Sequence, residues 1–348
     1  MERNGRLSEL DALRGLAALA VMLYHYTAQY PKLFHDKDSD LFINFSWGYL
    51  GVQLFFIISG FVIYMTLNST RSTKDFFVKR SIRLYPAYIV AVVLTFTLTT
   101  LYQLPGRTVG LSEALINLSM LQEFIGIKSV DGVYWTLRVE MTFYLFVGAL
   151  LLIPRLVKNI EVVALIWLLF CCMVKVIDYW VDSKITGGLN FITIGDYCNL
   201  FISGIMFYRI RQGNNSGLPH VMIALCLLYQ FIFSELITAI AVLIFFAIFY
   251  LLIFNKMTFI DIKPLVFLGS ISYCLYLIHQ NIGYIMIHSL ERWGINSQIG
   301  FIAPIAVCIV IAYCITKFIE QPVQNFIKKR LGSSSKPVKT IQSQRVNS

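Results

Sequence analysis

The sequence predicts an all-α, polytopic integral membrane protein, a helical bundle of about ten transmembrane helices with both termini in the cytosol. Hydrophobic residues make up 57% of the 348 positions and charged residues only 14%, and the mean hydropathy is +0.69. Such a chain has too little polar surface to cover a soluble domain of its length. Lipid is therefore the expected solvent for most of it, and membrane lipids are its first expected partners.

Ten apolar runs approach the roughly 20 residues that a helix needs to cross the hydrocarbon core of a bilayer. They lie near residues 10–29, 48–67, 84–102, 137–153, 161–180, 189–208, 218–234, 236–254, 265–288 and 298–319. Asp196 interrupts the sixth run, and only Ser234 and Glu235 separate the seventh from the eighth. An error of one span would reverse the orientation of everything that follows it.

The positions of the basic residues agree with this topology, because cytoplasmic loops of membrane proteins collect Lys and Arg. With the N-terminus inside, nineteen Lys and Arg residues fall on the cytosolic side and six outside, and four lie within or at the edges of spans. Topology thus explains the formal net charge of +10. No continuous basic face of the kind that binds nucleic acid is present, so we expect no nucleic-acid partner.

One membrane-embedded domain is predicted over residues 1–330, without an internal repeat. The one long external connection, residues 103–134, includes an amphipathic stretch from Leu111 to Phe124, and loops of this length are commonly functional or disordered. Residues 331–348 are rich in Ser and Lys, which predicts a disordered basic cytoplasmic tail. The seven cysteines lie mostly in apolar runs without CxxC spacing, and we interpret them as small packing residues.

Ionisable side chains inside the spans mark the candidate site, because each costs about 2.5–3.5 kcal/mol on insertion scales. Arg14 and His25 stand eleven residues apart in the first span. That spacing is close to three helical turns, so both face the same way, roughly 16 Å apart along the axis. Histidine is the usual general base at neutral pH. The alternative is a snorkelling arginine and a hydrogen-bonded packing histidine.

Two further groups lie on the third and fourth spans. Arg80 and Arg83, three residues apart at the cytoplasmic start of the third span, share one helix side, which suits phosphate binding by paired hydrogen bonds. An ordinary positive-inside cluster is the alternative. Glu140 is expected slightly inside the fourth span, at a depth similar to His25, where the two would form a carboxylate and imidazole pair. A salt bridge from Arg138 to Glu140 at the membrane edge is the alternative.

Trp135 and His279 complete the set. Trp135 starts the fourth span on its outer side, where an aromatic belt residue is the alternative to a substrate contact. His279 lies about fourteen residues into the ninth span and reaches the depth of His25, which favours a polar cavity between them; a helix-to-helix hydrogen bond is the alternative. No Walker loop, HExxH or GxSxG motif and no metal-ligand spacing occurs, so no metal is expected.

Together these segments resemble the acyltransferase-3 family of membrane-bound acyltransferases, in its stand-alone form, over essentially all of residues 7–330. Six motifs in the family's order carry the resemblance: DALRGLAALAVMLYH, GVQLFFIISGFVI, the Arg80 and Arg83 pair, YWTLRVE, LGSISYCLYLIH and IEQPVQ. Thr136 stands where the family commonly has Ser, and Gln280 and Asn281 follow His279 where a His-x-Pro pattern is frequent. These departures bear on the acceptor pocket and leave every proposed catalytic group in place.

The resemblance implies a cytosolic acyl-CoA donor, acetyl-CoA first, and a glycan or lipid-linked sugar acceptor whose hydroxyl is acylated at the outer side of a bacterial inner or plasma membrane. His25, oriented by Glu140, is expected to act as a general base or to carry the acyl group as an acyl-imidazole. The expected site comprises catalytic His25 and Glu140, cofactor-binding Arg14, Arg80 and Arg83, and substrate-binding Trp135, Arg138 and His279. The identity of the acceptor and the length of the acyl group stay open.

A secondary transporter or flippase for a sugar or lipid is the main alternative, because buried Arg, His and Glu also mark transport paths. A transporter is expected to have paired helices broken by Gly or Pro in corresponding halves of the chain, and the sequence predicts none. A non-catalytic scaffold would leave the insertion costs of Arg14, His25 and Glu140 unexplained.

Overall fold

The computed structural model describes residues 7–34, 43–67, 70–181, 183–214, 216–295 and 297–332, and every regular element in these ranges is a helix. The longer helices are α1 (Ser8–Tyr24), α3 (Gly51–Leu67), α4 (Thr73–Tyr102), α6 (Trp135–Leu151), α8 (Ile160–Val181), α9 (Lys184–Thr193), α10 (Cys198–Arg211), α11 (Leu218–Phe233), α12 (Leu236–Ile253), α13 (Lys263–Arg292), α15 (Ile302–Ile315) and α16 (Gln321–Gly332). The short helical segments are η1 (His25–Gln29), α2 (Tyr30–Phe34), η2 (Ser46–Leu50), α5 (Leu111–Asn117), η3 (Gln122–Ile125), η4 (Gly132–Tyr134), α7 (Pro154–Lys158), η5 (Thr258–Ile260), α14 (Ser297–Gly300) and η6 (Thr316–Glu320). The predicted all-α class is confirmed.

Each of the ten predicted apolar spans falls on one to three consecutive helical segments. By length and composition, seven helical segments of the described chain are able to cross a membrane: Ser46–Leu67, Thr73–Tyr102, Ile160–Val181, Lys184–Arg211, Leu236–Ile253, Lys263–Arg292 and Ile302–Arg330. Helices α1, α6 and α11 are shorter, with 17, 17 and 16 residues. A multi-pass membrane protein follows from this, while ten crossings and cytosolic termini stay predictions.

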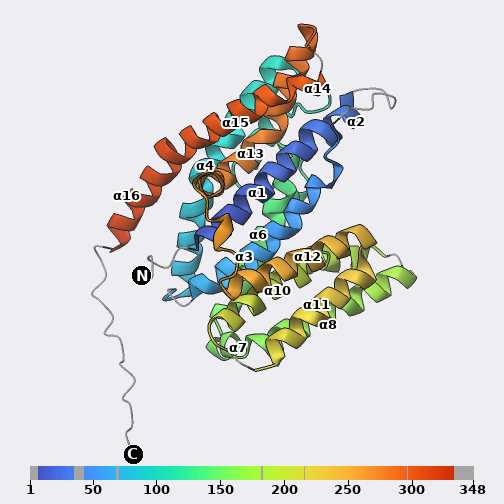
Figure 1. The fold of residues 1–348 in the computed structure, drawn as a ribbon, viewed down its shortest axis with the longest axis vertical. Coiled ribbons are helices and arrows are strands. Elements are labelled where there is room, and N and C mark those ends of the chain that lie inside the picture. The colour runs from blue at the N-terminus through green and yellow to red at the C-terminus, as the bar shows by residue number, and fades with distance from the viewer. Residues whose placement is uncertain are drawn as a thin grey trace, which may run out of the picture.

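The helices form two groups, which lie side by side in Figure 1. In the first, α13 packs along α1 and also contacts α4 and α15, while α6 contacts α4. In the second, α10 contacts α8, α11 and α12. Packing of α3 against both α1 and α10 joins the two groups. Every ionisable residue of the predicted site lies on the first group.

Glycines allow the two tightest helix crossings. A Cβ added at Gly15 would lie 2.7 Å from the backbone nitrogen of Gly269, so α1 and α13 touch backbone to backbone. Gly60 of α3 and Gly204 of α10 make a second crossing of this kind, where an added Cβ would lie within 2.2 Å of a carbonyl oxygen of the facing helix. Small residues at helix interfaces permit this approach in membranes, and the first crossing fixes the register between α1 and α13.

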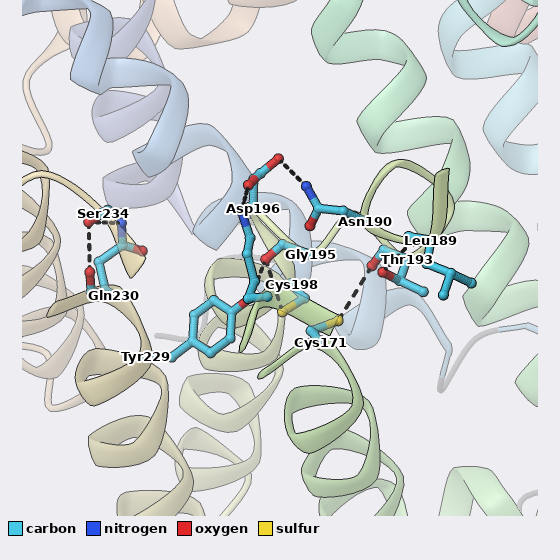
Figure 2. Close-up of polar contacts among 11 residues, drawn as sticks. Cys171, Leu189, Asn190, Thr193, Gly195, Asp196, Cys198, Tyr229, Gln230 and Ser234 are labelled. Carbon is cyan, nitrogen blue, oxygen red and sulfur yellow. Dashed lines mark hydrogen bonds and ion pairs between the residues drawn. The ribbon is translucent and has the colours of Figure 1, made fainter. Parts of the chain in front are cut away.

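The sixth predicted span, the one that Asp196 interrupts, is two helices rather than one. Helix α9 ends at Thr193, Ile194 adopts a left-handed φ of 49°, and α10 begins at Cys198. Side chains satisfy the carbonyl groups freed by the break: Tyr229 donates to the Gly195 oxygen at 2.8 Å, as Figure 2 shows, and Trp167 donates to the Thr193 oxygen at 3.1 Å. Non-helical backbone at membrane depth is tolerated only with such partners.

Charged groups gather at the same break. Asp196 forms an ion pair with Lys175, and Asn190 donates to its carboxylate at 2.9 Å; the latter contact is drawn in Figure 2. Asp196 therefore marks the end of one helix and the start of the next. Of the predicted tail, α16 includes residues up to Gly332, and residues 333–348 lie outside the described part of the chain.

Candidate active site

The structure brings the two predicted histidines into contact. The Nε2 atom of His279 on α13 lies 3.1 Å from the Nδ1 atom of His25, and the ring centroids are 4.9 Å apart in an edge-on arrangement. His25 opens a π-helical turn, η1, that continues α1. Widened turns of this kind occur frequently at functional sites, because they re-aim one side chain. Both rings are buried, so His25 faces the bundle interior and not lipid.

Hydrogen bonds fix which nitrogen of each ring carries the proton. His279 Nδ1 lies 2.8 Å from the carbonyl oxygen of Tyr276, which only accepts, so His279 is protonated at Nδ1 and presents a lone pair at Nε2. His25 Nδ1 then faces two acceptors, that lone pair and the Val21 carbonyl oxygen at 2.8 Å, and must carry the proton. His25 Nε2 is left unprotonated, and no described residue hydrogen-bonds it. A neutral imidazole held this way is ready to accept a proton.

All three predicted cofactor-binding arginines line one pocket on the N-terminal side of α1. This inner pocket spans about 740 Å³, including space open to solvent, and has Arg14, Arg80, Arg83 and Glu140 in its wall. Arg80 is buried, donates to the hydroxyl of Thr66 and lies over the Tyr144 ring at 5.7 Å. The prediction that Arg80 and Arg83 face one side of a helix is confirmed, since both reach the same cavity.

A second pocket of about 1010 Å³ adjoins the inner pocket and shares Arg14, Arg83, Ser272 and Tyr273 with it. Its wall also includes the start of α1 and the start of α16. These two segments come from opposite ends of the described chain and lie near the same end of the bundle (Figure 1). Arg14 and Arg83 therefore stand between this wider second pocket and the inner pocket.

The expected pair of His25 and Glu140 is wrong in geometry. Glu140 accepts hydrogen bonds from Ser59 at 3.1 Å and from Tyr144, and its charge acts on Arg14 rather than on His25. The cause is the depth at which α6 begins. Residues 130–134, expected in an external loop, are almost all buried within the bundle before α6 begins, and Glu140 lines the same pocket as Arg14.

One turn of α13 separates the inner pocket from the histidine pair. Thr136 and Tyr276 line the outermost part of the pocket; the Thr136 hydroxyl donates to the Tyr276 hydroxyl at 3.1 Å, and the Tyr276 ring lies 5.6 Å from His279. Neither histidine is among the residues that line the pocket. Tyr276 therefore stands at the point that a molecule in the inner pocket must pass to reach His25.

Trp135 and Arg138 face away from the inner pocket. Trp135 packs against the Tyr197 ring with centroids 5.6 Å apart. The Arg138 guanidinium donates to the Phe191 carbonyl oxygen at 3.1 Å and lies 3.9 Å above the ring of the same residue, so it ties α6 to α9. Arg138 and Glu140 stand two positions apart and point to different sides of α6, and no ion pair joins them in the described structure. The alternative of a salt bridge is thus also wrong.

Sequence reasoning missed a buried carboxyl group on the outer side of the histidines. Asp131 is fully buried, and it accepts hydrogen bonds from the backbone nitrogens of Asn281 at 3.1 Å and Val133 at 3.2 Å. Burial raises its pKa to about 7, although these hydrogen bonds oppose the rise. Asn281 returns a side-chain hydrogen bond to the Val130 oxygen at 2.9 Å. The external connection is thus held to α13 two residues beyond His279.

Among the described residues, no group of three or more His, Cys, Asp and Glu side chains is placed to hold a metal ion. The chemistry that this chain offers without one is a base, His25 Nε2, between an arginine-lined pocket and a polar loop. Such an arrangement suits proton transfer to the imidazole from a group that arrives on one side while an anionic molecule is held on the other.

Comparison with known proteins gives a family and several relatives. A sequence model of the Acyltransferase domain matches residues 7–317. Nodulation protein 10 of Rhizobium leguminosarum bv. viciae is 31% identical over 170 residues, which cover 44% of this chain and 46% of that protein. Peptidoglycan O-acetyltransferase OatA of Listeria monocytogenes is 30% identical over 188 residues, which cover 46% of this chain and 27% of that protein.

O-acetyltransferase OatA of Staphylococcus aureus (strain NCTC 8325) is 25% identical over 408 aligned positions, which cover 96% of this chain and 61% of that protein. In each of these three matches the chain spans less than two thirds of the relative's length. No solved structure matches the chain. The match to the domain model covers every residue of the predicted site, from Arg14 to His279.

Proposed function

The chain belongs to the acyltransferase-3 family, and we propose that this membrane O-acyltransferase takes an acyl group, with acetyl as the first candidate, from cytosolic acyl-CoA. The acceptor in this proposal is a hydroxyl of a cell-surface or lipid-linked glycan at the outer side of a bacterial membrane. The observation that carries the proposal is the His25 and His279 pair, which lies between the arginine-lined inner pocket and the external connection. O-acetyltransferases among the relatives support the acceptor hydroxyl.

The charges of the inner pocket support an acyl-CoA donor. Arg14, Arg80 and Arg83 face one carboxylate, Glu140, so the wall of the pocket carries an excess of positive charge. Guanidinium groups bind phosphate through paired hydrogen bonds. In the proposal, the nucleotide end of CoA occupies the second pocket, next to the inner one. Its phosphates contact the arginines, and the narrow pantetheine arm extends through the inner pocket.

The distance from the arginines to the base suits this donor. Arg14 lies roughly 16 Å from His25 along α1, and an extended pantetheine arm places the thioester well beyond the phosphates. The thioester would pass Tyr276 and stop beside His25 Nε2. Glu140 takes a changed role in this account: it neutralises part of the arginine charge and orients Arg14, instead of orienting His25.

The proposed reaction starts with an unprotonated His25. The acceptor hydroxyl gives its proton to His25 Nε2 as its oxygen attacks the thioester carbonyl carbon. The tetrahedral intermediate collapses with cleavage of the carbon–sulfur bond, and the CoA thiolate takes the proton from the imidazolium. Positive charge on the ring is stabilised at Nδ1 by the Val21 carbonyl oxygen and the His279 lone pair.

The same Nε2 atom serves an acyl-imidazole route. There it attacks the thioester itself, CoA leaves, and the alcohol then attacks the acyl-histidine. A burst of CoA equal to the enzyme concentration, released before any acceptor is added, identifies this route. Its absence identifies general base catalysis.

A transporter or flippase for a sugar or lipid is the second candidate, and the break between α9 and α10 favours it, because broken helices line substrate paths in many transporters. The break lies against Arg138 and Tyr229 and away from the histidine pair. It is a single break in the described structure and not one of a corresponding pair.

Purified protein with acetyl-CoA labelled in its acetyl group tests the proposal. His25→Ala is expected to abolish the release of CoA from acetyl-CoA. His220→Gln, a change at an exposed histidine, is expected to leave this release unchanged. Thermal stability of both variants in detergent controls for unfolding. Equal activity in wild type and His25→Ala would reject the catalyst, and solute movement without acylation would favour the transporter.

A further inference from the structure

A third pocket lies on the other side of the histidine pair from the arginines. This outer pocket, between the external connection and α13, spans about 870 Å³ and is lined by Arg107, Glu123, Gly126, Ile127, Lys128, Ser129, Val130, Gly132 and Asn281. Asn281 stands two residues beyond His279 on α13. Neither histidine lines this pocket, which approaches the pair through Asn281 on α13.

Two amide oxygens at this pocket have no hydrogen-bond donor. Asn281 is only 1% exposed, its nitrogen is used by Val130, and its Oδ1 atom has no partner in the described structure. Gln280 is 4% exposed, and its Oε1 atom is also without a partner. That oxygen lies 2.5 Å from the point where a Cβ on Gly132 would be, so it packs against Gly132, which lines the pocket, although Gln280 itself does not line it. Buried acceptors of this kind ordinarily have donors.

The cations of the pocket are not equivalent. Lys128 donates to the carbonyl oxygens of Gly106 and Thr108, both at 3.1 Å, and so holds the loop together. Glu123 accepts the hydroxyl of Ser129 at 2.6 Å. Arg107 lies over the Tyr284 ring at 5.7 Å, and none of the described residues accepts a hydrogen bond from its guanidinium. The pocket thus has one free cluster of donors, on Arg107, and one free acceptor on a lining residue, Asn281; the second free acceptor, on Gln280, lies next to the lining residue Gly132.

We infer that the outer pocket is the acceptor site and that it binds a polyhydroxylated ring: adjacent hydroxyls donate to Asn281 Oδ1 and Gln280 Oε1, and ring or substituent oxygens accept from Arg107. A lipid alcohol with one hydroxyl supplies a single donor and leaves the second amide oxygen unpaired. Gly132 belongs to the site because a side chain there would fill the space beside Gln280. The inference rests on the proposed function and names the substrate contacts of the same site.

The geometry also explains two departures from the family pattern. Gln280 and Asn281 follow His279 where a His-x-Pro pattern is frequent; here Asn281 lines the outer pocket and Gln280 packs against Gly132 in its wall. Asn281 holds its place through its side-chain nitrogen and the contact of its backbone nitrogen with Asp131. These two residues therefore tune the acceptor rather than the base.

The test gives the purified protein labelled acetyl-CoA and an equimolar mixture of methyl glycosides of glucose, galactose, mannose, rhamnose and N-acetylglucosamine, with cyclohexylmethanol as the single-hydroxyl probe. Products are identified by mass. We expect acetyl esters of the glycosides and less than about a tenth as much cyclohexylmethyl acetate, since losing one buried polar partner costs at least tenfold in specificity. Equal acylation of both probes would overturn the inference, as would turnover of acetyl-CoA without acylation of any glycoside. No turnover of acetyl-CoA at all would instead reject the proposed function.

Variants locate the contact. Arg107→Gln and Gly132→Val are expected to raise the KM for the glycosides about tenfold, with a smaller change in the KM for acetyl-CoA. Arg292→Gln, a change at the other arginine on the predicted outer side and an exposed one, is the matched control with unchanged kinetics. Asn281→Leu removes an amide oxygen but also a structural hydrogen bond, so Gly132→Val, which leaves that bond in place, decides the case. A glycoside KM equal to that of wild type in both Arg107→Gln and Gly132→Val would overturn the inference.

Discussion

The inner and outer pockets lie on either side of one histidine pair, and different kinds of residue line them. The inner pocket is lined by charged side chains on long helices, with three arginines and Glu140 in its wall. The outer pocket is lined by residues of the external connection, among them Arg107, Glu123 and Lys128, and by Asn281 of α13. A wall of guanidinium groups suits phosphates, whereas amide oxygens suit hydroxyls. In the proposed reaction, the donor and acceptor sites therefore differ in chemistry and meet at His25.

The largest effect on activity is expected at the pair of His25 and His279. His279→Leu removes the lone pair that faces His25 Nδ1, so the ring is held by Val21 alone, and we expect kcat to fall by about 100-fold or more, by analogy with loss of an orienting partner in hydrolases. His279→Gln keeps an acceptor oxygen and should recover about tenfold of that loss. Steady-state rates with acetyl-CoA measure both. A kcat for His279→Leu near that of wild type would contradict the assigned tautomers.

A smaller effect is expected in the inner pocket. Arg83→Gln removes one phosphate contact and should raise the KM for acetyl-CoA by about 10- to 100-fold, with little effect on S-acetylpantetheine, which lacks the nucleotide. The ratio of the two specificity constants is the measurement. Arg71→Gln, at an exposed arginine on the same predicted side, serves as control. An equal loss with both donors would show that Arg83 does not contact the nucleotide end.

Glu140 sharpens the comparison further, because it was expected beside His25 and lies among the arginines. Glu140→Gln should change the KM for acetyl-CoA by up to about threefold, in the range of a single partly screened charge, and should leave the pH midpoint of kcat unchanged. The pH profile of kcat is the measurement. A shifted midpoint would show that Glu140 interacts with the His25 ring and would contradict its placement among the arginines.

The smallest effect concerns stability at the outer pocket. Burial raises the pKa of Asp131 to about 7, above the usual value near 3.9 of an unfolded chain. The folded protein therefore keeps this proton longer than the unfolded one, so its stability falls as pH rises from about 4 to about 7 and then levels off. Asp131→Asn removes this contribution. We expect a smaller difference in melting temperature between pH 5 and pH 8 in Asp131→Asn than in wild type; an equal difference would contradict the raised pKa.

Much of the fold was predictable because hydropathy reports directly on lipid contact. All ten apolar runs are helical, and the periodicity of one helix placed Arg80 and Arg83 on a common side. Counting residues along two helices placed His25 and His279 at one depth, and the structure joins them by the direct contact that was the alternative to a polar cavity between them. These predictions depend only on helix geometry and on the cost of placing charge in lipid.

The rest depended on backbone that leaves the regular helix, which hydropathy does not describe. Glu140 was misplaced because residues 130–134 return into the bundle before α6 begins. Asp196 signalled an interruption of the sixth span, but the left-handed turn at Ile194 and the ion pair of Asp196 with Lys175 could not be read from hydropathy. Asp131 and Arg107 gave no signal, since a loop charge is ordinarily solvated. Tyr276 was detectable, because it stands one helical turn before His279.

The central claim is that His25 accepts a proton between a donor on the inner side and an alcohol on the outer side, and sidedness tests it most directly. Proteoliposomes of known orientation receive labelled acetyl-CoA on one side only, with the methyl glycosides on the other. The account predicts acetylated glycoside outside when acetyl-CoA is on the side of Arg83, and none in the reverse arrangement or with His25→Ala. Product formed only when donor and acceptor share one side would contradict it.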